Sequence, residues 1–179
     1  MYRTHTCGEL RSSHVGQNVT VSGWVNRRRD HGGVVFFDLR DRSGVVQVTI
    51  NPDLAKDVLD VVANVRFEWV LQIEGLVHTR PAGMENPKMA TGEIEIIAKN
   101  ITVLNPSKTL PFMVSGENDL PDENTRLKYR YLDLRRERMT RNLVLRHRII
   151  KFMRDYLDKE GFIEIETPIM FKATPEGAR

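Results

Sequence analysis

The stretch that most constrains the fold runs from residue 23 to residue 48, GWVNRRRDHGGVVFFDLRDRSGVVQV. It predicts three short strands joined by two turns that contain charged residues and glycine. In the middle strand the period-2 rule places Val35, Phe37 and Leu39 together on the core face. Phe36 must then lie on the opposite face, which is an unexpected place for an aromatic ring.

The neighbouring strands add polar groups to the face that carries Phe36. In the third strand Val46, Val48 and Ile50 take the core side. Gln47 therefore projects with Phe36, and the basic run at 27–29 precedes the first turn. An exposed ring, an exposed amide and several cations on one sheet are what single-stranded nucleic acid binds to. The alternative is an ordinary amphipathic sheet with a half-exposed phenylalanine, and composition alone does not separate the two.

The composition excludes other classes of protein. No apolar run approaches the roughly 20 residues of a membrane span, and residues 1–10 lack the apolar segment of a signal peptide. The single cysteine, Cys7, excludes an internal disulfide framework and suits a reducing, cytoplasmic environment. Although the net charge is only +3, residues 126–154 hold eleven Lys or Arg and two acidic residues. Such a segment favours a polyanionic partner, although a solvated helix face is the commoner explanation.

The order of the predicted elements is that of an all-β, five-stranded OB barrel, βββαββ. A helix falls between the third and fourth strands, and in the fifth strand Ile94 and Ile96 face inward while Glu95 faces outward. The ligand face of an OB barrel is the one that carries Phe36 and Gln47 here. We therefore favour nucleic-acid binding over an OB fold used for protein or sugar contacts.

A change in composition divides the chain near residue 105, where prolines begin to interrupt any periodicity. We expect an OB domain in residues 1–105, a hinge in residues 106–138 and the start of a second domain in residues 139–179. The second domain begins with a long amphipathic helix that Gly161 ends, followed by a strand at 162–166. One helix and one strand cannot bury each other's apolar faces, so this is the opening of a truncated α+β domain.

Five blocks of the sequence together resemble bacterial aspartyl-tRNA synthetases, which are class II enzymes. They follow the family's order over the whole chain, whereas any one block would be a weak signal. The blocks are GWVNRRRD at 23–30, MATGEIE at 89–95, LKYRYLDLRR at 127–136, the helix and strand ending in ETP at 166–168, and TPEGAR at 174–179.

The resemblance implies that the OB domain binds the anticodon. Phe36 would stack on an anticodon base, and Gln47 and Glu95 would read the edges of the first two bases. Stacking and complementary hydrogen bonds are what such recognition requires. Arg29, and with it Arg27, would contact the backbone or bases of the anticodon loop. By the same resemblance Arg80 lies in the loop that reads the third base. The alternative for each arginine is a solvated surface charge.

Specificity and substrate binding also follow from the resemblance. His31 with Gly83 is similar to the form that charges both tRNA(Asp) and tRNA(Asn) with aspartate. Those anticodons differ in the third base, cytosine against uracil, so tolerance requires removing the contact that rejects uracil. Glu176 would engage the ammonium group of aspartate from a loop that closes over it, and Pro168 would end the dimer-interface motif.

The resemblance further implies a homodimeric, cytoplasmic aspartate–tRNA ligase that uses ATP and Mg²⁺. If tRNA(Asn) is charged, a tRNA-dependent amidotransferase would act downstream. The family places the ATP and Mg²⁺ sites in later motifs, so we expect no catalytic residue here, no ligase activity from the 179 residues alone, and weak tRNA binding. The alternative function is a stand-alone OB module for RNA or single-stranded DNA, which leaves the basic hinge and the TPEGAR ending unexplained.

Overall fold

The computed structural model describes residues 2–53, 56–116 and 120–170. It divides into two compact units, Met1–Leu110 and Pro111–Arg179.

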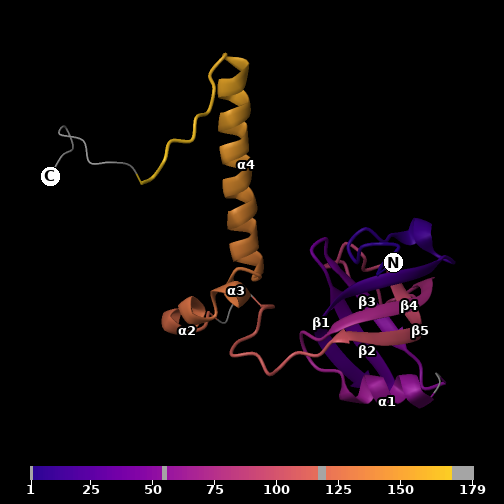
Figure 1. Ribbon diagram of the computed structural model, residues 1–179. Helices are drawn as coiled ribbons and strands as arrows, with labels where there is room; N and C mark the ends of the chain where they lie inside the picture. Colours follow the sequence, from indigo (N-terminus) through magenta and orange to yellow (C-terminus); the bar gives the residue numbers. More distant parts are fainter. Residues whose placement is uncertain (1, 54–55, 117–119, 171–179) are drawn as a thin grey trace, which may run out of the picture. The chain divides into compact units, whose positions relative to one another are not determined.

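The first unit is a closed barrel of five strands (Figure 1). The order around the barrel is β1-β2-β3-β5-β4, and pairing of β1 with β4 closes it. All neighbours are antiparallel except β3 and β5, which pair in parallel. The predicted OB fold is confirmed. The strands are β1 (Asn18–His31), β2 (Val34–Arg40), β3 (Val45–Ile50), β4 (Val70–Thr79) and β5 (Ile94–Asn105), and a short 3-10 helix, η1 (Ser12–His14), precedes them.

The barrel core is built from the predicted alternation. Val35, Phe37 and Leu39 of β2 are buried, and the residues between them are half-buried. The core side of β3 is also as predicted, because Val46, Val48 and Ile50 are at most 1% exposed. Period-2 alternation therefore correctly assigned the two faces of both strands.

The first strand extends further than the sequence predicts. Asp30 and His31, which the sequence places in a turn, belong to β1 and pair with Val35 and Val34. The turn is the dipeptide Gly32-Gly33, whose φ angles of 62° and 86° suit a two-residue hairpin connection. Two glycines can adopt positive φ at little cost, so the strand continues up to them.

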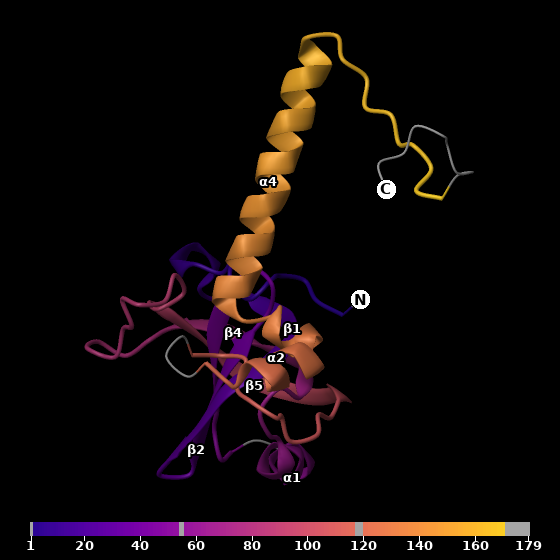
Figure 2. The ribbon, with the colours of Figure 1, turned by 90° about the vertical axis from the view of Figure 1, so that its left-hand side faces the viewer.

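Helix α1 (Lys56–Asn64) lies across one end of the barrel (Figure 1). Val58, Val62 and the following Val65 are buried in the same core as the strands. The tip of the β1–β2 hairpin lies at this end as well (Figure 2). These valines form an apolar stripe along α1, and this stripe is the face that closes the barrel.

The second unit begins with the short helices α2 (Glu123–Lys128) and α3 (Arg130–Asp133), followed by α4 (Glu137–Lys159). Gly161 has a φ of 83° and follows Glu160, the C-cap residue of α4, so the helix ends at this glycine as the sequence predicts. The predicted strand at 162–166 does not form, and this expectation was wrong. A strand needs a neighbour for its N–H and C=O groups, and none of the residues described in this unit pairs with it.

A buried ionic cluster fixes the α2–α3 turn. The Asp133 carboxylate is fully buried and accepts hydrogen bonds from Arg126 and Arg130, at 3.0 Å from Arg126 Nε and 2.6 Å from Arg130 Nη1. Arg136 is also buried and donates to the carbonyl oxygens of Met113 and Gly116. These arginines of the basic segment are therefore held by internal partners, which lowers the charge available to a polyanion.

Candidate nucleic-acid interface

A β-bulge in β1 decides which arginines lie on the outer face of the barrel. The pairing shifts between Val25 and Arg27, and from there Arg27 lies opposite Asp38 and Arg29 opposite Phe36. Arg28 lies on the other side of the strand, and its Nη1 donates to the carbonyls of residues 62, 63 and 65 at the end of α1. Arg27 and Arg29 are thus placed on the candidate interface, whereas Arg28 caps a helix.

Phe36 lies on this outer face, as the sequence indicates, and is half-buried rather than fully exposed. The guanidinium carbon of Arg29 is 5.8 Å from the centre of its ring. The ring of His31 lies 6.3 Å away at an interplanar angle of 57°. An aromatic ring on a sheet surface beside a cation provides a stacking platform for a base.

The predicted base-reading groups form one hydrogen-bonded network. Arg29 Nη2 donates to Asp38 Oδ1 at 2.6 Å and to Gln47 Oε1 at 3.1 Å. Gln47 Nε2 in turn donates to Glu95 Oε2 at 3.0 Å, and the Thr49 hydroxyl donates to the same oxygen. Side chains from β1, β2, β3 and β5 thereby meet on one surface.

The network is more enclosed than the sequence predicts. Gln47 and Glu95 point away from the core but are each only 7% exposed. The expectation of an exposed amide was therefore wrong, because neighbouring polar side chains cover it. Buried polar groups are stable only when they are hydrogen-bonded, and here Gln47, Thr49 and Glu95 satisfy one another. Arg29 is satisfied through its Nη2, whereas its Nε is buried without a hydrogen-bond partner among the described residues.

Arg80 follows β4 and lies beside the network. It is 6% exposed, and its Nε donates to the Ile94 carbonyl at 3.0 Å. Its Nη2 is buried and has no hydrogen-bond partner in the part of the chain that the structure describes. Burial lowers the pKa of Arg80 from its ordinary value, and the nearby carboxylates of Glu95 and Asp38 act in the opposite direction. An orphaned guanidinium N–H here can donate to an acceptor that enters from outside.

The two predicted specificity positions lie in different turns. His31 is exposed at the end of β1, beside the ring of Phe36. Gly83 lies between β4 and β5 with a φ of 82°, and an added Cβ would meet no heavy atom within 4 Å. Its N–H donates to Glu85 Oε2 at 2.9 Å. A side chain at residue 83 therefore has space but a strained backbone.

The remaining predicted site residues belong to the second unit. Pro168 is exposed in the extended segment that follows α4. Glu176 lies outside the described residues.

Two residues of the network were not singled out as candidates from the sequence. Asp38 holds Arg29 across the β1–β2 ladder, and Thr49 holds Glu95. The signal for both was available, because each shares the outward side of its strand with Phe36 or Gln47.

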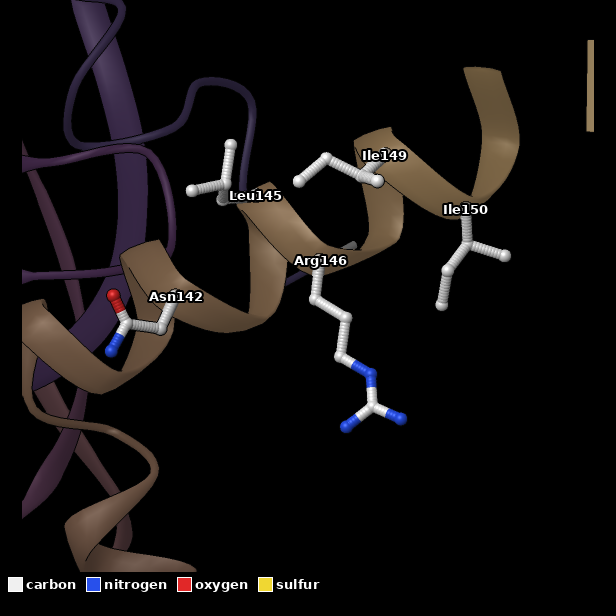
Figure 3. A pocket seen from close by; sticks show the side chains of 5 residues that line it. All are labelled: Asn142, Leu145, Arg146, Ile149 and Ile150. Atoms are coloured by element: carbon white, nitrogen blue, oxygen red, sulfur yellow. The ribbon is translucent and has the colours of Figure 1, made fainter. Parts of the chain in front are cut away.

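A shallow hollow lies along α4 in the second unit, where the five side chains shown in Figure 3 line it. All five come from one helix, so the hollow has a single wall and lacks the convergent polar groups of a ligand pocket. Its apolar members, including Leu145 and Ile149, are about half exposed, which is typical of a packing face. The lining residues are Asn142, Leu145, Arg146, Ile149 and Ile150.

Neither a metal site nor a membrane-spanning helix is present in the described ranges. Residues 2–53, 56–116 and 120–170 contain no group of three His, Cys, Asp or Glu side chains arranged to hold a metal ion. No helix within these ranges is long and apolar enough to cross a membrane.

Two family models match the chain. Residues 19–104 match the OB-fold nucleic acid binding domain of the tRNA anticodon type, and residues 122–179 match class II tRNA synthetases (D, K and N). The first match covers the barrel, and the second begins at the N-cap of α2. The chain thus combines an OB-fold nucleic-acid-binding domain with part of a class II tRNA synthetase domain.

Curated relatives identify the family within this class. The aspartate–tRNA(Asp/Asn) ligase of Dehalococcoides mccartyi strain CBDB1 is 54% identical over 179 residues, which are 100% of this chain and 30% of the relative. The enzyme of the same name from Prochlorococcus marinus strain NATL2A is 56% identical over 99% of this chain and 30% of its own length. The chain belongs to the aspartyl-tRNA synthetase family, and it spans about a third of the length of these relatives.

Solved structures agree on the fold. A putative aspartyl-tRNA synthetase from Leishmania major Friedlin has a TM-score of 0.80 and 26% identity, over 91% of this chain and 34% of that chain. Asparaginyl-tRNA synthetase from Pyrococcus horikoshii, complexed with asparaginyl-adenylate, also has a TM-score of 0.80, at 21% identity over 94% of this chain and 37% of that chain.

Proposed function

We propose that the full-length protein is an aspartate–tRNA ligase and that the barrel of this chain recognises the anticodon of its tRNA. The observation that carries this proposal is the outer-face network of Gln47, Thr49 and Glu95 beside the ring of Phe36. We assign residues 1–105 to anticodon binding, 106–138 to the hinge and 139–179 to the start of the catalytic domain.

Each group of the network has a role in this proposal. Phe36 stacks on one anticodon base, and the Arg29 guanidinium, which lies over the same ring, places a cation beside it. Gln47 offers both a donor and an acceptor, and Glu95 offers acceptors, so together they read the first two bases. Arg27 is exposed at the rim and contacts phosphate.

Arg80 reads the third base through its orphaned Nη2. A base carbonyl or ring nitrogen would satisfy this donor, and cytosine and uracil both present a carbonyl oxygen at position 2. A donor that meets a feature shared by both bases binds either one. Arg80 therefore supplies affinity at the third position without rejecting uracil.

We propose that the enzyme charges both tRNA(Asp) and tRNA(Asn). Gly83 places no side chain near the third base that would reject uracil, and His31 accompanies it. Aminoacylation of both transcripts by the full-length protein tests this. Comparable rates are expected, and a strong preference for the tRNA(Asp) transcript would refute relaxed specificity. The double variant His31→Leu and Gly83→Lys should shift the ratio toward tRNA(Asp).

Other features of the whole enzyme are proposals of the same kind. Class II chemistry uses ATP and Mg²⁺, and the groups that hold them are expected outside this segment. Glu176 binds aspartate, and Pro168 belongs to the interface of a cytoplasmic homodimer. An amidotransferase that converts the aspartyl group on tRNA(Asn) would act on the product.

The 179-residue chain itself allows a direct test. It should bind an RNA stem-loop with the anticodon GUC more tightly than one with a scrambled loop, and the affinity should fall as salt is raised. It should show no ATP-dependent aspartylation. Equal binding to both loops would favour the stand-alone OB module, which the match of residues 122–179 to class II synthetases disfavours.

A further inference from the structure

The bulge in β1 is an extra residue held between two fixed points. At one end Trp24 pairs with Arg40, and at the other His31 pairs with Val34 beside the glycine turn. Between these pairs β1 has one residue more than β2, and the shift in register lies at Asn26. The extra residue has to be accommodated somewhere along this part of the hairpin.

The place of the bulge decides which arginines reach the outer face. With the extra residue at Asn26, Arg29 lies opposite Phe36. If the extra residue were at position 29 instead, Arg28 would lie opposite Phe36. Arg27 would then lie opposite the fully buried Phe37, on the core side. A change of one residue in register reverses the faces of everything between the old and new positions.

A partly buried clamp holds the bulge at Asn26. Arg40 Nη1 donates to Asn26 Oδ1 at 2.6 Å. Arg40 Nη2 donates to both carboxylate oxygens of Glu68, at 2.8 and 3.0 Å. The backbone N–H of Glu68 donates to the carbonyl of Val25 at 2.9 Å, on the other side of the bulge. Arg40 and Glu68 therefore link the side chain of Asn26 to the carbonyl of Val25, the residue before it.

Glu68 has an unusual backbone conformation, which its contacts in the clamp hold in place. Glu68 is 6% exposed and has a φ of 62°, the sole positive φ at a residue other than glycine within the described ranges. L-residues rarely adopt this conformation, and it persists where surrounding contacts enforce it. Here it directs both the N–H and the carboxylate of Glu68 toward the bulge and Arg40.

We propose that Arg40 and Glu68 are positioning residues for RNA recognition, which act by pinning the bulge and so keep Arg27 and Arg29 on the interface. This inference rests on the proposed anticodon-binding function. Arg40 acts through Asn26, because its guanidinium donates to Asn26 and Glu68 and does not itself contact RNA in this proposal.

The experiment is a double-mutant cycle in the 179-residue chain, with the GUC stem-loop as probe and fluorescence anisotropy as readout. Arg40→Met should weaken binding about tenfold, the equivalent of one to two lost contacts. Deletion of Asn26 removes the extra residue, so that Arg27 follows Val25 directly and still lies opposite Asp38. This deletion should keep the affinity within about twofold, and Arg40→Met should then have no further effect.

Arg66→Met is the matched control, because Arg66 is an exposed cation of the same barrel and lies outside the clamp. It removes the same charge and should change the affinity by less than about twofold. A second readout is the cross-strand NMR contact between the backbones of Arg29 and Phe36. In Arg40→Met this contact should weaken, and a contact between Arg28 and Phe36 should appear.

An equal loss of affinity from Arg40→Met with and without Asn26 would overturn the proposal, because Arg40 would then act on RNA or stability directly. Unchanged NMR contacts in Arg40→Met would overturn it too, and this result decides the matter even if the deletion variant fails to fold. If the unaltered chain does not prefer the GUC loop but the NMR contacts still move, the proposed function fails while the clamp's control of register stands.

Discussion

Phe36 and Phe37 are adjacent in β2 and should respond to truncation in opposite ways. Phe37 is fully buried in the barrel core, whereas Phe36 is half-buried on the outer face beside His31 and Arg29. The two substitutions remove the same atoms from neighbouring positions of one strand. Any difference between them therefore reports which face each ring occupies, and not the chemistry of the substitution.

The expected magnitudes are well separated. Phe37→Ala should cost about 3–5 kcal/mol of stability, a large part of the roughly 5–15 kcal/mol of a typical domain. Phe36→Ala should cost about 1 kcal/mol, which lowers Tm by roughly 4–8 °C in a barrel of this size. Loss of base stacking should weaken RNA binding by about 1–3 kcal/mol, or roughly 5- to 150-fold.

Thermal unfolding and anisotropy with the GUC stem-loop measure the two effects on the same protein. Phe37→Leu is the practical control, since it perturbs the core by about 1–2 kcal/mol and should remain folded. It should bind RNA with nearly unaltered affinity at temperatures well below its Tm. If Phe36→Ala lost as much stability as Phe37→Ala, or bound RNA as tightly as the unaltered chain, the assignment of Phe36 to a stacking role would be wrong.

Three further predictions concern other parts of the molecule. Glu95→Gln should cost about 2 kcal/mol of stability, because two charge-assisted hydrogen bonds become neutral ones, and should lower the GUC preference in the anisotropy assay. Burial raises the pKa of the Cys7 thiol above its ordinary value of 9.0, so the native chain should resist thiol reagents at pH 8 and lose stability above about pH 9 as the unfolded thiol ionises. Arg136→Met should cost about 1.5–3 kcal/mol in the second unit only, seen as faster amide exchange around α3 with an unchanged barrel Tm.

The faces of the strands could be predicted from the sequence because alternation is a local property. Val35, Phe37 and Leu39 follow it without interruption, and so do the valines of β3. Strand length was less predictable, because it depends on partners. β5 runs to Asn105, well beyond the alternation at residues 94–96 by which the strand was assigned, since β4 pairs with it along its whole length. The strand expected at 162–166 has no such partner within the described residues and does not form.

The candidate site was predicted in outline but not in its environment. Gln47 and Glu95 were assigned to the correct face, yet their burial depends on a contact between residues 48 positions apart. No local pattern contains that information. The bulge was missed for a related reason. Asn26 is followed by three arginines, so the sequence has no alternation there that would show where the register shifts.

The enclosure of the network determines how the proposed site would discriminate. The amide of Gln47 and the carboxylate of Glu95 are already paired within the barrel, so a base that enters must replace hydrogen bonds that exist. A base with matching donors and acceptors exchanges one set for another at little net cost. A mismatched base leaves a buried polar group unsatisfied, at about 1–3 kcal/mol for each group. Arg80 is different, because its Nη2 has no partner to give up among the described residues, and any acceptor in reach is a gain. On this reasoning Gln47 and Glu95 would set specificity by rejecting wrong bases, and Arg80 would add affinity at a position where either pyrimidine is accepted.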